Sequence, residues 1–267
     1  MSGQRFGAPE LATLLASPHL AGLRRLDLGL YASWDMVKVV TSAPQRPRLT
    51  HLYLYSSRLD AAGFRQLAGT DLPSLASLHL GGTHQMGAPG AKALASAPFL
   101  AHLRELILTN NSLGARGMEA LAAGPHFRCP ARLEVGMNGL GAAGLRALLA
   151  APGLEGLVAL ELSDNSLDGA ALADLAASTR LGGLLSLDLC KNPGVGPAGA
   201  EALAGSPHLA RLASLDLRGC RIGEAGARAL LGSPHLRRLQ LALVREDKSQ
   251  LSEKTLAALR ERYLLAE

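Results

Sequence analysis

The chain has 267 residues, of which 48% are hydrophobic and only 3% aromatic, and its formal net charge is +5. Its three cysteines are too few for a disulfide framework, which favours a reducing compartment and a cytoplasmic location. Residues 1–25 lack the basic start, apolar run and cleavage site of a signal peptide. No apolar stretch reaches the roughly 18 residues that a membrane span needs, so we expect no membrane partner.

Residues 1–22 precede the first complete unit of the repeating pattern described next. Residues 8–15 have the apolar spacing of a helix, with no strand before them. Two interpretations stay open: this helix serves as a cap, or it is the second half of a repeat in a longer protein.

The pattern Leu-x-x-Leu-x-Leu then recurs nine times, and it dominates the sequence. Successive units are 26 to 28 residues apart, except for a last step of 24. A fixed period of this length indicates a solenoid, in which each unit packs only on its neighbours. The first position of the pattern falls at Leu23, Leu49, Leu75, Leu103, Pro130, Leu157, Leu184, Leu212 and Leu236.

One unit, residues 157–175, shows how each repeat is expected to fold. Leu160 and Leu162 alternate with polar residues, as in a short strand with one buried face. Asn165 follows at a turn, and Asp168 is a typical residue to cap the next helix. A loop then returns the chain to the next strand. Consecutive strands should therefore pair in parallel, with helices on the other side.

Asparagine recurs at the turn position of four consecutive units, always 27 residues apart. Residues in phase become neighbours in a solenoid, so we expect their amides to form a hydrogen-bonded ladder. The ladder consists of Asn111, Asn138, Asn165 and Asn192.

Nine repeats thus cover residues 23–244, and residues 245–267 follow a different pattern. Residues 245–248 form a charged turn, and Ser252 is well placed to cap a helix. Its apolar side chains are expected to cover the core of the last repeat. These side chains are Leu256, Leu259 and Tyr263.

The nine units resemble the leucine-rich repeats of the ribonuclease-inhibitor-like subtype, including bacterial arrays, and are also similar to those of Ran GTPase-activating protein. The resemblance covers roughly residues 8–245. It implies an α/β fold, a right-handed horseshoe with a parallel sheet on the concave face and helices on the convex face. It also implies a function in binding proteins.

Two glycine patterns imitate a dinucleotide-binding motif. Residues 139–144 and 194–199 both match it, but the same glycines recur in repeats that lack the full motif. We therefore assign them to helix starts and expect no cofactor. Arginines scatter over the chain and aromatic side chains for base stacking are scarce, which argues against a nucleic-acid partner.

Four histidines share one position in the return loops of different repeats, so they should not converge on a metal ion. They are His19, His126, His208 and His235. No arrangement of serine, histidine and carboxylate residues favours catalysis, and we expect no catalytic residue and no metal.

The residue between the second and third leucines should project from the concave sheet face. Repeats five to eight place four carboxylates there, partly offset by Arg218. Two interpretations stay open: the acidic stripe keeps the face soluble, or it receives a basic segment of a protein partner. The nine residues at this position are Asp27, Tyr53, His79, Ile107, Glu134, Glu161, Asp188, Asp216 and Gln240.

A second candidate surface lies over the first repeats. It comprises His51, Tyr53, Tyr55 and His79, with Trp34 in an irregular turn beside them. Aromatic clusters of this kind are typical of binding hot spots, although the rings could equally fill space around an atypical first turn.

The sequence therefore predicts a monomeric, non-enzymatic protein-interaction scaffold whose concave face binds a protein partner. The resemblance also implies an alternative, a regulator of a GTPase or of another enzyme, acting as an activator or an inhibitor. A third possibility is a targeting module of a larger multidomain protein.

Overall fold

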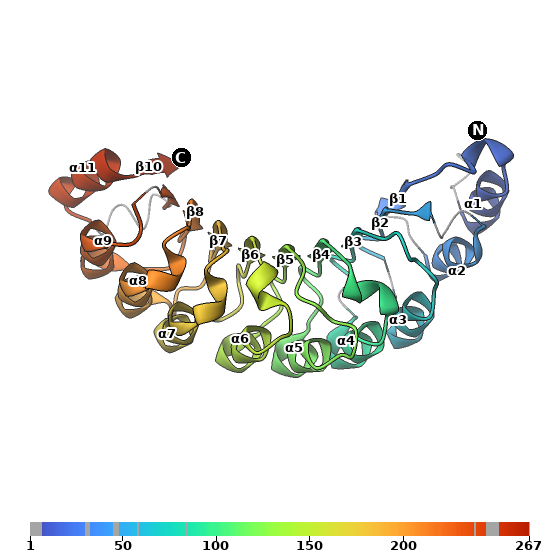
Figure 1. Ribbon diagram of the computed structural model, residues 1–267, viewed down its shortest axis with the longest axis horizontal. Helices are drawn as coiled ribbons and strands as arrows, with labels where there is room; N and C mark the ends of the chain where they lie inside the picture. Colours follow the sequence, from blue (N-terminus) through green and yellow to red (C-terminus); the bar gives the residue numbers. More distant parts are fainter. Residues whose placement is uncertain are drawn as a thin grey trace, which may run out of the picture.

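The computed structural model describes residues 7–29, 33–44, 48–57, 59–83, 85–237, 239–243 and 251–266. Short strands alternate with helices, and the chain forms an arc with strands on its inner side and helices on its outer side (Figure 1). All the described strands belong to one parallel sheet, in which each pairs with the next along the chain. The strands are β1 (Arg25–Asp27), β2 (His51–Tyr53), β3 (Ser77–His79), β4 (Glu105–Ile107), β5 (Arg132–Glu134), β6 (Ala159–Glu161), β7 (Ser186–Asp188), β8 (Ser214–Asp216), β9 (Gln240–Ala242) and β10 (Leu264–Ala266).

The outer layer consists of α-helices, and short 3-10 helices lie in several of the return loops. The α-helices are α1 (Ala8–Leu15), α2 (Trp34–Ser42), α3 (Ala61–Ala68), α4 (Gly87–Leu94), α5 (Gly114–Ala122), α6 (Gly141–Leu149), α7 (Gly169–Ala177), α8 (Gly196–Gly205), α9 (Gly223–Gly232) and α11 (Glu253–Arg262). The 3-10 helices are η1 (Pro18–Leu20), η4 (Pro98–Ala101), η5 (Leu154–Gly156), η6 (Thr179–Leu181) and η7 (Pro207–Leu209).

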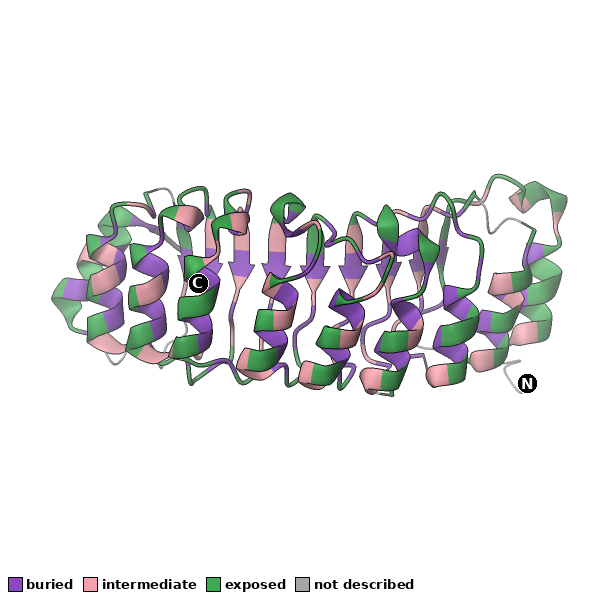
Figure 2. Cartoon of the chain, turned by 60° about the horizontal axis from the view of Figure 1, so that its bottom comes forward, coloured by how far each residue is buried: buried purple, intermediate pink, exposed green. Residues whose placement is uncertain are grey.

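A single apolar core runs along the arc between the sheet and the helices. The middle residue of each strand from β1 to β9 is a buried leucine, and the helices turn their buried residues toward the sheet (Figure 2). Full burial of a leucine side chain contributes about 2 kcal/mol. Every period therefore adds a similar increment, which explains why the leucine pattern predicts the fold so well.

The glycines that imitate a dinucleotide motif have a conformational role. Gly141 and Gly196 each begin a helix, as do the in-phase Gly114 and Gly223 of other repeats, all with φ between 55° and 58°. This left-handed region favours glycine, because a side chain there crowds the backbone. The recurrence of glycine at this position is thus explained by the turn into the helix.

The asparagine ladder links successive repeats, and Asn165 shows its geometry. Its Oδ1 accepts the backbone N–H groups of Asn138 at 3.1 Å and Leu140 at 3.2 Å, both in the preceding repeat. Its Nδ2 donates to the carbonyl oxygen of Val135 at 2.9 Å. Asn111, Asn138 and Asn192 are buried in the same way. At the next in-phase position, Cys220 Sγ donates to the carbonyl oxygen of Leu189 at 3.1 Å.

The predicted helix after the last repeat is present as α11. Ser252 Oγ accepts the N–H of Thr255 at 3.2 Å and so caps it. Leu259 and Tyr263 are buried, and Leu256 packs against the core. The charged turn predicted at residues 245–248 lies outside the described residues.

Two sequence-based assignments differ from the structure near this end. Asp216 pairs with Ala242, so Gln240 does not continue the acidic row and instead lies beside Ser214. The ninth pattern therefore begins at position 238 and not at Leu236. In addition, β10 follows α11 and pairs in parallel with β9, a strand that the leucine pattern did not predict.

No helix in the described part of the chain combines the length and the apolar character that crossing a membrane requires.

Candidate protein-binding face

Four carboxylates lie in register across neighbouring strands of the concave face. Glu134 pairs with Glu161, Glu161 with Asp188, and Asp188 with Asp216. Neighbouring strands are about 4.8 Å apart, so these side chains form a continuous acidic row. The structure thus brings these four predicted residues together, with Arg218 at one end.

Glu161 is tied to the backbone of two repeats. Its Oε2 accepts the N–H of Gly136 at 2.8 Å, and its Oε1 accepts the N–H of Ser163 at 2.9 Å. A Cβ atom at position 136 would lie only 2.3 Å from Oε1, so only glycine leaves room for this contact. The side chain is therefore held in place, but backbone hydrogen bonds do not cancel its charge.

Arginines neutralise the two ends of the row. Arg132 Nε lies 2.9 Å from Glu134 Oε1 and 3.4 Å from Glu105 Oε1. Arg218 contacts both carboxylate oxygens of Asp216, with Nε 2.8 Å from Oδ2. Within the described residues, neither Glu161 nor Asp188 forms an ion pair. The uncompensated negative charge is therefore concentrated in the middle of the row.

The environment of Asp188 reflects this charge. Burial raises the pKa of its carboxyl group to about 6, and repulsion by Asp216 and Glu161 adds to the effect. A hydrogen bond from the N–H of Cys190 at 2.8 Å acts in the opposite direction. A carboxylate with a raised pKa is one whose negative charge the site stabilises poorly.

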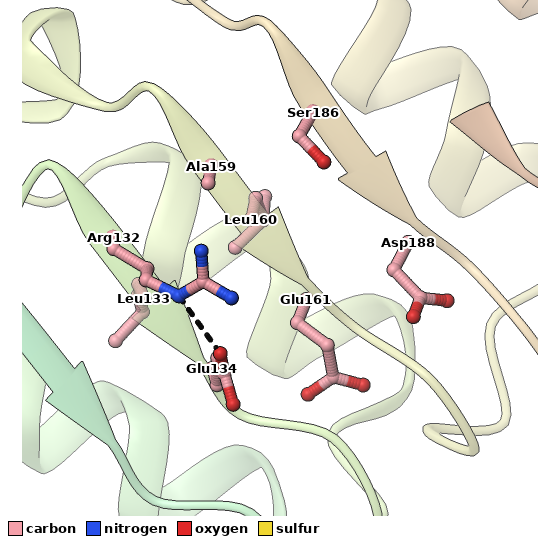
Figure 3. A pocket seen from close by; sticks show the side chains of 8 residues that line it. All are labelled: Arg132, Leu133, Glu134, Ala159, Leu160, Glu161, Ser186 and Asp188. Carbon is pink, nitrogen blue, oxygen red and sulfur yellow. Dashed lines mark hydrogen bonds and ion pairs between the residues drawn. The ribbon is translucent and has the colours of Figure 1, made fainter. Parts of the chain in front are cut away.

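A shallow hollow of about 320 Å³ lies beside the row, over β5, β6 and β7 (Figure 3). It exists because Ala159 and Ser186 are small, whereas the preceding strand carries the long side chain of Arg132 at the same register position. Figure 3 shows Arg132 bonded to Glu134, with Glu161 and Asp188 on the following strands. The hollow gives access to the two carboxylates that have no cationic partner.

The predicted aromatic cluster, His51, Tyr53, Tyr55 and His79, is also assembled on the concave face. Tyr53 makes edge contacts with both histidines, and Tyr55 stacks on His79 with ring centroids 5.0 Å apart. Arg25 donates to the Tyr53 hydroxyl at 2.9 Å. Burial lowers the pKa of His79, so its imidazole is neutral at physiological pH.

Trp34 does not belong to this cluster, contrary to the sequence prediction. It is the first residue of α2, on the outer layer, and its ring lies against Gly63 of α3. Trp34 was predicted to lie in an irregular turn beside the cluster, but capping by Ser33 starts a helix at this residue and carries the indole to the helical side.

One group of side chains on this face has the spacing of metal ligands. Asp188, Cys190 and Asp216 each place one ligand atom within 4.8 Å of the others. Arg218 occupies both oxygens of Asp216, and burial raises the pKa of the Cys190 thiol. Both features disfavour cation binding, so we assign no metal to this group.

The leucine-rich repeat family model matches residues 71–95, 99–122 and 211–231. No curated protein sequence matches the chain. Among solved structures, the complex of Rad7 and Elc1 from yeast resembles it with 16% sequence identity and a TM-score of 0.43, over 97% of this chain and 83% of that chain. Each matched segment spans one strand and all or most of the following helix. Three segments similar to this family, within one parallel sheet backed by helices, are consistent with the fold of an α/β leucine-rich-repeat solenoid.

Proposed function

We propose that this protein is a non-enzymatic interaction scaffold that binds a basic segment of a protein partner on its concave face. The observation that carries the proposal is the pair Glu161 and Asp188, adjacent carboxylates that form no ion pair within the described residues, since the nearby Arg132 and Arg218 pair with Glu134 and Asp216. They border an accessible hollow.

The physical basis is electrostatic. Like charges one strand apart repel by roughly 1 kcal/mol in water, and by more near a low-dielectric surface. A lysine or arginine side chain placed between Glu161 and Asp188 replaces this repulsion with attraction and charge-assisted hydrogen bonds. Because binding favours the ionised form of Asp188, affinity should fall as the pH drops below about 6.

The test replaces the two central carboxylates by amides, Glu161→Gln together with Asp188→Asn. Amides remove the charge but keep an oxygen that can accept the N–H groups of Gly136 or Ser163 and of Cys190. Lysine would leave those N–H groups without an acceptor, so charge reversal is a poorer test.

Binding of a fluorescein-labelled nonalysine peptide is measured by anisotropy. We expect the double variant to bind at least about tenfold more weakly than the wild type, a loss of about 1.4 kcal/mol. The matched control is Glu119→Gln with Glu201→Gln, which makes the same charge change on exposed positions of α5 and α8. Equal weakening in both double variants would contradict the proposal, because the peptide would then respond only to net charge.

We also place the repeats in the ribonuclease-inhibitor-like subtype, because the outer segments are α-helices of eight to ten residues.

The aromatic cluster supports a second contact for the same partner. Its side chains are half-buried, so part of each ring faces the concave space.

A further inference from the structure

About half of the described arginines lie along one edge of the ribbon. We define the return-loop rim as the residues from the end of each helix to the first residue of the next strand. Its short helices follow the upper edge of Figure 2. In the described residues this rim holds nine arginines, no lysine and three carboxylates. The arginines are Arg24, Arg25, Arg48, Arg104, Arg128, Arg132, Arg180, Arg211 and Arg237, and the carboxylates are Asp71, Glu105 and Glu155.

The opposite edge, from the end of each strand to the next helix, has the reverse balance. Its described residues hold eight carboxylates, Asp27, Asp60, Glu134, Glu161, Asp164, Asp168, Asp188 and Asp216, against three cations, Lys191, Arg218 and Arg221. Arginines also lie on several helices, as expected, but the loops of this edge carry more of them than the loops of the opposite edge. The return-loop rim faces solvent as a cationic surface, which attracts anions.

A hollow of about 520 Å³ lies on this rim between the return loops before β8 and β9. Arg211 comes from the first loop, and His235 and Arg237 come from the second. Between them the lining is mostly apolar, with Leu212, Ala213 and Pro234. Cationic groups thus surround an apolar floor.

The second loop is rigidly held. Ser233 is buried, its Oγ donates to the carbonyl oxygen of Ala204 at 2.6 Å, and the same Oγ accepts the N–H of His235 at 3.2 Å. Arg237 Nε donates to the carbonyl oxygen of Pro234 at 2.9 Å. This bond orients the guanidinium and leaves its terminal NH₂ groups available.

These arginines differ from Arg180 on the same rim. Arg180 pairs with Glu155 at 2.6 Å and donates to the carbonyl oxygens of Leu149 and Ala151. In the described structure, neither Arg211 nor Arg237 has a carboxylate partner. The hollow is therefore lined by two arginines that have no internal carboxylate partner in the described structure.

The ligand that fits is an anion with an apolar body. Guanidinium groups bind phosphate through paired hydrogen bonds, and they favour it over compact monovalent anions because it carries more charge and more acceptors. The volume is in the range of sites for small organic molecules, more than a bare phosphate fills. An apolar floor suits an aromatic ring attached to the phosphate.

We propose that the hollow between Arg211, His235 and Arg237 binds an aryl phosphate monoester, either the side chain of a phosphotyrosine in a partner protein or a free small molecule. The phosphate lies between the two guanidinium groups, and the ring lies mainly on Ala213 and Pro234.

Isothermal titration calorimetry with phenyl phosphate at pH 8 tests the site. We expect saturable binding to the wild-type protein and at least about tenfold weaker binding to inorganic phosphate and to phenol. Arg211→Gln with Arg237→Gln should weaken phenyl phosphate binding by about tenfold or more, without a change in the thermal midpoint. No saturable binding to the wild type, or equal binding of inorganic phosphate and phenyl phosphate, overturns the proposal.

The matched control is Arg104→Gln with Arg128→Gln, which removes two exposed arginines of the same rim outside the hollow. We expect less than about twofold weakening. If both double variants weaken binding equally, the rim attracts anions only through its overall charge and the site is refuted. A phosphotyrosyl tripeptide that binds more tightly than phenyl phosphate supports a partner protein as the source, and equal affinity supports a free ligand.

Discussion

At the scale of single residues, the asparagine ladder shows how one side chain type can join a whole array. Each amide satisfies backbone groups that the turn leaves unpaired, and it does so across the boundary between repeats. The corresponding position in an earlier repeat is Ser57, which is buried but whose hydroxyl has no hydrogen-bond partner in the described structure. A serine side chain is too short to span the gap, so the ladder does not extend there.

Asn165→Ala should therefore destabilise the protein strongly. It leaves the N–H groups of Asn138 and Leu140 buried without an acceptor, which costs about 3 kcal/mol. Urea unfolding followed by circular dichroism measures the change. Ser57→Ala is the control at the equivalent position and should change stability by less than about 0.5 kcal/mol, because no bond is lost. Similar losses in both variants would show that the hydrogen bonds of the ladder are not the cause.

Asp188 makes the free energy of unfolding decrease as the pH rises, whereas a carboxylate with a lowered pKa has the opposite effect. Its pKa is 3.8 in the unfolded reference and about 6 in the folded protein, so the folded state binds more protons in this window. Stability due to this group is highest below pH 4, falls as the pH rises through 4 to 6, and stays lower above pH 6.

Asp188→Asn should accordingly stabilise the protein at pH 7.5, on the order of 1 kcal/mol after allowance for solvent screening, and have little effect at pH 4. Urea unfolding at both pH values measures this, with Glu119→Gln as an exposed control. An equal effect at pH 4 and pH 7.5 would mean that the charge of Asp188 is not responsible.

At the scale of elements, one carboxylate in the first turn of α9 accepts several of the hydrogen bonds that attach α11 to the array. Glu224 accepts hydrogen bonds from Thr255 Oγ at 2.5 Å, from the Ser252 N–H at 2.9 Å and from Arg228 Nε at 2.9 Å. These bonds lower the pKa of Glu224 to about 2, and the hydrogen bond from Thr255 has the largest effect. The attachment is therefore fully formed above the ordinary pKa of 4.5, and it is lost as the pH falls toward 2.

Glu224→Ala should loosen α11 while the rest of the array keeps its structure. Hydrogen exchange at pH 7 is expected to become faster by an order of magnitude or more in residues 253–262, because their contact with α9 is weakened. Glu201→Gln on α8 is the control, since no hydrogen bond in the described structure involves its side chain. Unchanged exchange in α11 would show that the apolar contacts of Leu259, with the hydrogen bonds of Arg262 and Tyr263 to the preceding repeat, are sufficient.

The elements also show where sequence reasoning succeeds and where it stops. Strands β1 to β8 follow from the leucine period, because each buries one leucine and the register repeats. In the ninth repeat Leu239, Leu241 and Leu243 alternate, so two placements of the pattern fit and only the pairing with β8 decides between them. Strand β10 has no following leucines or asparagine to mark it.

At the scale of the whole molecule, residues that share one position of the repeat lie side by side on neighbouring strands and form a continuous surface. The acidic row could be predicted because its members share one position. The bonds of Glu161 to Gly136 and Ser163 could not, since they depend on the direction of a side chain and on the space above a glycine. The cationic rim was missed because its arginines occupy several different positions within the return loops, and they coincide on one edge only in three dimensions.

The ladder has a polarity that extends over the molecule. Each asparagine accepts from the repeat that precedes it, so every turn in the ladder relies on the one after it. Loss of a later repeat would leave the backbone N–H groups of the turn before it without an acceptor, whereas loss of an earlier repeat would leave only the side-chain amide of the next asparagine without those partners. Unfolding that starts from the last repeats therefore exposes unpaired backbone groups in the repeats that remain, and unfolding that starts from the first repeats does not.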